Sequence, residues 1–447
     1  MVDSTENEAA QIEPRPARDD RSLARVVGGF SLVNAIFVAA GLITGPLLAR
    51  ALGPTDRGAL AAIVAPLTAT PFIASLGLNV YAAREAARGA RLGRVFGTTA
   101  LMLIAIGVLV GAVSSPLADL FARGRSTVYL YLLVGFVLTP LWLLTYLLLD
   151  LSQGLARWRP LASSRLAPPI ASVVALTVLF ALDKLTLSAA AIVFLATTAA
   201  SILPLLGIRR LVSNIRFDRR TAKEGLRFGL PAWVASLAAL GNVRLDQLVM
   251  IRLSSSRELG FYAVAVSLAG FSIILTASVR TAIFPRSARH DALLASRATR
   301  VTIAIVIAAT AAAAGVTPFL LPALFGRSFD AAVAMTWILL GAGIPMAGTH
   351  VLGIVLTAWG HPKSAAGAEI MALAVTIPGL FLLIPLWGGI GAAIVSLAAY
   401  TTNFLVQLVA TRRIVGGRYA DFLIPTRADI AWTAKSLRRL PGLSRFA

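Results

Sequence analysis

The chain of 447 residues contains no cysteine and only three histidines. Without cysteine there can be no disulfides and no thiolate metal sites. His290, His350 and His361 are widely scattered in the sequence, so they do not form a metal-ligating pattern. The sequence also has no Gly-rich loop ending in Lys-Ser or Lys-Thr, and so gives no sign that ATP is an energy source. We therefore expect no metal and no cofactor.

Acidic residues are also scarce, with 20 Asp and Glu against 41 Lys and Arg and a net charge of +21. A basic chain can bind nucleic acid, but these basic residues lie in short segments at the ends of apolar runs rather than on one polar domain. With 57% apolar residues and a mean hydropathy of +0.81, the chain belongs to the membrane class. Anionic headgroups of the inner leaflet, rather than nucleic acid, are the expected counter-charge.

Long apolar runs dominate the sequence and predict an all-α polytopic membrane protein. A helix needs about 20 apolar residues to cross a bilayer. Twelve such runs occur, near residues 26–49, 58–80, 95–115, 128–149, 166–182, 186–208, 226–251, 260–284, 301–324, 331–357, 364–386 and 388–411. Residues 1–25 are polar and contain no apolar signal-peptide core, so we expect the first run to remain as an uncleaved membrane anchor.

The basic residues are sorted between alternate connections of these twelve spans. The two tails and the even-numbered loops hold 31 of them, the odd-numbered loops hold 8, and only Arg244 and Arg280 lie within spans. Short loops rich in Lys and Arg stay in the cytoplasm. Both tails are therefore predicted to be cytoplasmic, and the odd-numbered loops to face outward.

The spans form two related halves. The longest internal polar stretch, 209–227, separates the sixth span from the seventh. A constant offset of 202 aligns Arg50, Asp56, Gly58 and Ala61 with Arg252, Glu258, Gly260 and Ala263. We interpret this match as a duplication, although two helix corners could also converge on such residues. Because six spans is an even number, the copies have the same orientation, and the substrate site of such parallel repeats lies between them.

The predicted domain order follows from this division. It comprises a disordered cytoplasmic tail at 1–25, an N-lobe of six spans at 26–212, a basic cytoplasmic loop at 213–225, a C-lobe of six spans at 226–415 and a basic tail at 416–447. In the second tail, the segment from Trp432 to Leu440 is predicted to form a short helix lying on the inner leaflet.

The seventh span carries the main polar cluster, made of Asn242, Arg244, Asp246 and Gln247. Charges inside a bilayer are costly and default to functional hypotheses. The spacing places Asn242 with Asp246 on one helix face and Arg244 with Gln247 on another. We expect at least one of these faces to meet other helices or a water-filled cavity. The alternatives are that Arg244 extends toward the membrane surface and that Asp246 only pairs with a neighbouring helix.

Further polar residues lie in other spans. His350 and Asp246 are candidates for coupling to a proton or sodium gradient, although a packed histidine is the simpler interpretation of His350. Asn34 and Gln407 are amides that could line a cavity, whereas most such residues hold helices together. Arg280 lies close to the cytoplasmic end of the eighth span, so we expect its side chain to extend toward the membrane surface.

The outward connections are too short for an extracytoplasmic enzyme. None is predicted to exceed about a dozen residues, whereas catalysis there needs carboxylates positioned for acid or base chemistry. The outward acids are few: Asp56, Asp119, Asp183, Glu258 and Asp330. We therefore expect a transporter rather than an enzyme.

Several segments resemble the polysaccharide-unit flippases of the multidrug/oligosaccharidyl-lipid/polysaccharide exporter superfamily. They span roughly 26–415 and include 49–58, 228–231, 244–247, 258–262, 284–286, 324–329 and 384–393. The resemblance implies two six-helix lobes around a central cavity that opens to alternate sides. It also implies export of a polyprenyl-diphosphate-linked oligosaccharide across the bacterial cytoplasmic membrane for cell-surface polysaccharide synthesis.

An anionic diphosphate would need cationic side chains near the cavity, and Arg244 and the rim residues Arg50 and Arg252 are the candidates. A drug/cation antiporter of the same superfamily would need a buried carboxylate, and the predicted N-lobe spans have no internal Asp or Glu. A peptidoglycan lipid-precursor flippase stays open, and so does a membrane scaffold that recruits a polymerase or glycosyltransferases through its basic loop.

Overall fold

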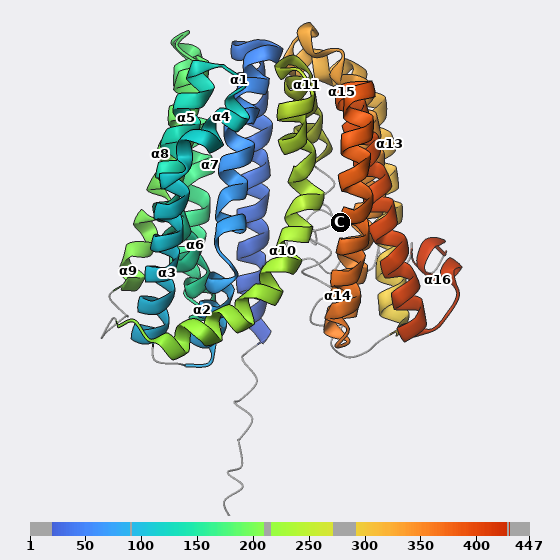
Figure 1. The fold of residues 1–447 in the computed structure, drawn as a ribbon. Helices are drawn as coiled ribbons and strands as arrows, with labels where there is room; N and C mark the ends of the chain where they lie inside the picture. Colours follow the sequence, from blue (N-terminus) through green and yellow to red (C-terminus); the bar gives the residue numbers. More distant parts are fainter. Residues whose placement is uncertain (1–19, 90–91, 210–215, 271–291, 427–428, 430–447) are drawn as a thin grey trace, which may run out of the picture.

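A computed structural model describes residues 20–89, 92–209, 216–270, 292–426 and 429. The described residues form helices and their connections (Figure 1). The all-α prediction is therefore confirmed. The expectations for the tail at 1–25, for Arg280 and for the helix at 432–440 concern residues outside this part.

The first half of the chain begins with one long helix that is broken at a glycine. Helix α1 (Asp20–Ala74) contains Gly53 at φ 66°, a conformation that favours glycine, and its two arms correspond to the first two predicted spans. Helices α5 and α6 meet at 52° and together cover the fourth span. The remaining elements are α2 (Leu78–Ala87), α3 (Leu92–Ala112), α4 (Ser114–Ala122), α5 (Ser126–Val137), α6 (Thr139–Gly154), α7 (Trp158–Ala181), α8 (Leu187–Ala200), the 3-10 turn Leu203–Leu205 and α9 (Leu206–Arg209).

The second half contains a broken helix of the same kind near its end. Helix α15 (Pro362–Val415) is broken at Gly388, where φ is 53°, and its arms correspond to the last two predicted spans. The other elements are α10 (Arg219–Leu253), α11 (Ser256–Ala269), α13 (Ala292–Phe325), the 3-10 turn Arg327–Phe329, α14 (Ala332–Ala358) and α16 (Tyr419–Leu423).

Within the described part, seven helices are long and apolar enough to cross a membrane, or nine if each bent pair is one span. Two of these seven, α1 and α15, each contain two predicted spans. The chain is therefore a multi-pass membrane protein. The count of twelve stays a prediction, because the eighth span continues from α11 into residues 271–291.

The two halves meet closely at one end of the bundle, next to Gly53 and Gly388, which we call the predicted outer end (Figure 1). A side chain on Gly58 would overlap the main-chain oxygen of Ser256, and one on Gly260 would overlap that of Pro54. Gly58 and Gly260 are 202 residues apart, as are Pro54 and Ser256. The predicted repeat is thus visible as a symmetric contact between α1 and α11.

Helix α10 connects the halves at the opposite end. It begins at Arg219, inside the segment predicted as a loop, and bends by 41° around residue 235. Its lower arm, Arg219–Val234, runs beneath the first half (Figure 1). There Trp233 Nε1 donates hydrogen bonds to the carbonyls of Phe72 and Ile73, at 3.1 and 3.0 Å. The arm therefore packs on the first half, while the upper arm packs on α15 in the second half.

The start of the C-terminal tail is anchored to the second half. Phe422 of α16 is buried in a cluster with Ile303 and Phe404. Asp429 is 2% exposed and accepts hydrogen bonds from Arg297 Nε at 2.9 Å and from Arg300 Nε at 2.6 Å. Asp429 thus fastens the tail to the N-terminal part of α13.

Replacing Asp429 by Asn should lower stability most clearly at neutral pH. The Arg300 guanidinium holds the pKa of Asp429 well below its usual value. A depressed folded-state pKa adds stability above the unfolded value of about 3.9, and this stability is lost as the pH falls further. At pH 7, Asp429→Asn should cost about 2 kcal/mol, the scale of a hydrogen bond to a charged group.

The measurement is the thermal unfolding of the purified protein in detergent between pH 7 and pH 3. The difference between wild type and Asp429→Asn should shrink below about pH 4. Asp330→Asn is the control, because Asp330 is exposed. Equal melting temperatures for wild type and Asp429→Asn at pH 7 would contradict the anchor.

Candidate functional site

A cavity of about 270 Å³ with a mixed polar and apolar lining lies between the two halves. It is lined by α1, α7 and α8 from the first half and by α10 and α11 from the second. Its polar lining residues are Thr44, Arg57, Ser172, Arg244, Gln247 and Ser267, and the rest of the lining is apolar. Because it opens between the repeats, the cavity has the position expected of a substrate site in a repeat transporter.

Two arginines give the cavity its charge. Arg57 comes from α1 in the first half and Arg244 from α10 in the second. Neither forms an ion pair with another residue of the described part, and Arg57 Nε is buried there without a hydrogen-bond partner. The described lining contains no Asp or Glu. The cavity is therefore suited to an anion, whose oxygens would satisfy the guanidinium donors.

The opposite face of α10 is turned into the second half. Asn242 is buried, and its amide donates to the Glu369 carboxylate at 2.8 Å and to the Glu369 carbonyl at 3.0 Å. The Thr376 hydroxyl donates to Asn242 Oδ1 at 3.2 Å, and the Tyr400 hydroxyl donates to the Asn242 carbonyl at the same distance. These contacts fix α10 against α15.

Asp246 belongs to the same buried face. One of its carboxylate oxygens accepts a hydrogen bond of 2.5 Å from the Tyr262 hydroxyl, and the other accepts from the Gln247 main-chain N–H at 2.6 Å. Tyr262 also lies 3.3 Å from the Ser396 hydroxyl. The carboxylate therefore joins α10 to α11, and Tyr262 connects both to Ser396 of α15. Asn242 and Asp246 share one face of α10 and Arg244 and Gln247 line the cavity on another, as helical spacing predicts.

The described side chains of the other candidates are not part of the cavity lining. Gln407 is buried and donates to Asn403 Oδ1 at 3.0 Å within α15. His350 is half-buried in α14 and does not belong to the cavity lining. Asn34 lies on α1, but its side chain is outside the described part. Roles for these residues in binding or ion coupling stay predictions.

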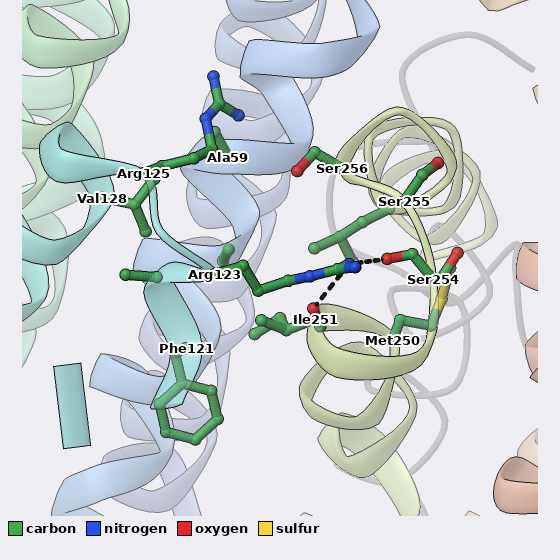
Figure 2. Close-up of a pocket in the computed structure, with 13 residues that line it drawn as sticks. Ala59, Phe121, Arg123, Arg125, Val128, Met250, Ile251, Ser254, Ser255 and Ser256 are labelled. Atoms are coloured by element: carbon green, nitrogen blue, oxygen red, sulfur yellow. Dashed lines mark hydrogen bonds between the residues drawn. The ribbon is translucent and has the colours of Figure 1, made fainter. Parts of the chain in front are cut away.

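Arg50 and Arg252 lie at the predicted outer end, where both are bonded to main-chain carbonyls. Arg50 Nε donates to the Leu324 carbonyl at 2.9 Å, and Arg252 donates to the Leu120 carbonyl at 3.0 Å. Arg123 donates similarly to the carbonyls of Ile251, at 3.2 Å, and Ser254 (Figure 2). The pocket beside Arg123 has a volume of only about 10 Å³, roughly that of one water molecule, and the main-chain contacts at Gly58 and Gly260 bring the halves together at this end.

Arg57 was missed in the sequence because it lies in a predicted outward connection, where a basic residue is ordinary. The available signal was its place next to Gly58, the residue where the halves touch. Tyr262 was missed for a different reason: nothing in its local sequence indicates a contact with Asp246, sixteen residues earlier.

The fold is shared with solved membrane transporters. The chain resembles the lipid II flippase MurJ in an inward closed conformation, with a TM-score of 0.69, 15% identity and 88% coverage of each chain. It resembles an inward-facing MATE-family multidrug transporter with a TM-score of 0.67 and 14% identity, over 85% of this chain and 94% of that one. A MOP superfamily transporter from Pyrococcus furiosus gives a TM-score of 0.58 and 13% identity, over 88% and 95%.

These similarities, together with a cavity between two repeats, define the class: the chain has the fold of the MOP superfamily of membrane transporters. No curated protein matches the sequence. The polysaccharide biosynthesis protein model matches residues 26–291, more than half of the chain, and the chain belongs to that family. The family resemblance seen in the sequence is confirmed.

Proposed function

We propose that the protein moves a polyprenyl-diphosphate-linked oligosaccharide across the bacterial cytoplasmic membrane by alternating access. The observation that carries this proposal is the cavity between the halves, with Arg57 and Arg244 from opposite sides and no carboxylate in its described lining. Arginine binds phosphate oxygens through paired hydrogen bonds, so the two residues could hold the diphosphate from both lobes. Gln247 and the hydroxyls of Thr44, Ser172 and Ser267 would contact polar groups of the ligand.

The cavity charge separates this function from drug/cation antiport. A cationic drug is favoured by a carboxylate in the cavity, whereas both charged lining residues are arginines. Asp246 is held by Tyr262 and the Gln247 main chain in the second half rather than lining the cavity. We therefore expect anionic substrates, with coupling, if any, to a proton or sodium gradient through the second-half network that contains Asp246.

A peptidoglycan lipid-precursor flippase is the second candidate, because one similar structure is named a lipid II flippase. Lipid precursors of both kinds carry a diphosphate, so the two arginines support either substrate. The family match to polysaccharide biosynthesis proteins favours the polysaccharide unit. The basic tails and even-numbered loops would then face the cytoplasm, where polysaccharide polymerases and glycosyltransferases are candidate partners.

Deletion of the gene tests the proposal through the lipid that accumulates. We expect a diphosphate-linked oligosaccharide to build up in the inner leaflet while surface polysaccharide is lost. Accumulation of a peptidoglycan precursor would favour the second candidate. If no lipid-linked intermediate accumulates, the protein is not a flippase of this kind, and a non-transporting scaffold becomes the better explanation.

A further inference from the structure

Three arginines cross between the halves at the predicted outer end. Arg50 and Arg123 belong to the first half and donate to carbonyls of α13 and α10; Arg252 belongs to the second half and donates to α4. Every acceptor is a main-chain carbonyl in the last turn, or at the C-cap, of the helix concerned. We call these three residues the arginine clasp.

The acceptors explain why arginine is used. The last carbonyls of a helix have no partner within it and carry the negative end of the helix dipole. A guanidinium with five donors can satisfy them across a gap. Arg50, for example, reaches both Leu324 and Ala323. Each contact therefore stabilises a helix end and joins the two halves.

Two carboxylates at this end, Asp56 and Glu258, form their contacts within their own halves. Asp56 pairs with Arg125 at 2.6 Å in the first half, and Glu258 accepts from the Gly389 N–H at 3.2 Å in the second. In the arginine clasp, the hydrogen bonds between the halves are therefore donated by positively charged guanidinium groups and accepted by neutral main-chain carbonyls. When the halves separate, water can replace both partners without leaving a buried ion uncompensated. Such contacts are strong enough to hold the end closed and still reversible.

The clasp also follows the repeat. Arg50 and Arg252 are 202 residues apart, and the residues whose carbonyls they meet, Leu324 and Leu120, are 204 apart. Each copy therefore directs the same arginine at the same helix end of the other copy. Closure of the outer end is built twice, around the contact between Gly58 and Gly260.

We propose that the arginine clasp acts as a latch, meaning that its hydrogen bonds hold the two halves together at the outer end. The clasp then sets the fraction of molecules that are closed on that side. This inference rests on the proposed transport function, because a latch has a role only if the halves part. Arg50 and Arg252 are then gate residues rather than contacts for the substrate in the cavity.

The absence of cysteine from the chain allows a direct test. Ser267→Cys places one thiol in the cavity beneath the closed end. Its labelling by a membrane-impermeant maleimide added outside intact cells reports opening of the outer end and needs no transport assay. Weakening the latch with Arg50→Gln and Arg252→Gln together should raise the labelling rate about tenfold, by shifting the population toward the open state.

Arg125→Gln is the matched control. It removes one positive charge at the same end, but the partner of Arg125 is Asp56 in its own half, so the labelling rate should stay at that of the Ser267→Cys parent. Arg50→Lys with Arg252→Lys should lie in between, because lysine keeps the charge with fewer donors. Labelling is normalised to total thiol after denaturation, and melting temperature identifies a variant that has lost its fold.

Two results in intact cells would overturn the latch. One is an unchanged labelling rate in the folded double glutamine variant, and the other is an equal rise in Arg125→Gln. A rise seen only in inside-out vesicles would place the clasp on the cytoplasmic side and also reject the proposal. If the labelling behaves as expected but deletion accumulates no lipid-linked sugar, the latch stands and the substrate assignment fails.

Discussion

Replacing Arg57 and Arg244 together by glutamine should lower the initial rate of polysaccharide export about a hundredfold. Each arginine brings a cationic group into the cavity from a different half, and each would bind the diphosphate of the substrate. A hydrogen bond to a charged group contributes about 1.5 kcal/mol or more, and every 1.4 kcal/mol corresponds to about a tenfold change. The single replacements should therefore lower export about tenfold each.

The measurement is surface polysaccharide formed after induction of the variant in the deletion strain, relative to protein abundance in the membrane. Arg57→Lys and Arg244→Lys should recover part of the rate, since lysine keeps the charge but lacks the planar pair of donors. The control is Arg327→Gln, which removes an exposed arginine outside the cavity. Export at the wild-type rate by the folded double glutamine variant would show that the cavity charge has no part in transport.

This prediction concerns two residues of different origin: Arg244 was identified from the sequence, whereas Arg57 was identified only from the structure. Arg244 was identifiable because a charge in the middle of an apolar span is unusual. Arg57 has no such signal, since it precedes the apolar run that forms the second arm of α1. Its place in the cavity depends on the close packing of α1 against α11, a contact between residues about 200 positions apart.

The same distinction holds for the fold. Apolar runs and their polar connections predicted most helix positions, because hydropathy and helical period are local properties. The first residues of the lower arm of α10, 219–225, were predicted as a loop because of their charge, and Arg219, Arg220 and Lys223 are exposed. Helix forms there because the other face, including Gly225 and Gly229, packs on the first half.

Arg50 and Arg252 show a further limit of sequence reasoning. Their shared place in the repeat was correct, and their charge made them candidates for binding an anion. The sequence could not show that their guanidinium groups already donate hydrogen bonds to helix carbonyls of the opposite half. These acceptors are main-chain atoms, which have no sequence signature. Main-chain acceptors of this kind are found only once the helix ends are placed in space.

Gly58→Ala should prevent normal closure of the outer end and lower stability by about 3 kcal/mol, the upper range for overpacking. The added methyl group would overlap the Ser256 carbonyl, which is main chain and cannot move aside by changing rotamer. The halves must separate for the methyl group to fit. Gly260→Ala should act alike, because its methyl group would overlap the Pro54 carbonyl in the symmetric position.

Two measurements test this expectation together: thermal unfolding in detergent, and maleimide labelling of Ser267→Cys from outside. Both glycine variants should melt earlier and label faster than the parent. Gly41→Ala is a matched control on the same helix, because nothing lies within 4 Å of the methyl group it adds. Its melting temperature should be equal or higher, since alanine favours a helix over glycine by about 1 kcal/mol. A contrary result would be that Gly58→Ala has the same melting temperature as Gly41→Ala and is labelled at the rate of the Ser267→Cys parent. In that case the two halves do not meet at these glycines in the membrane, and the symmetric closure is wrong.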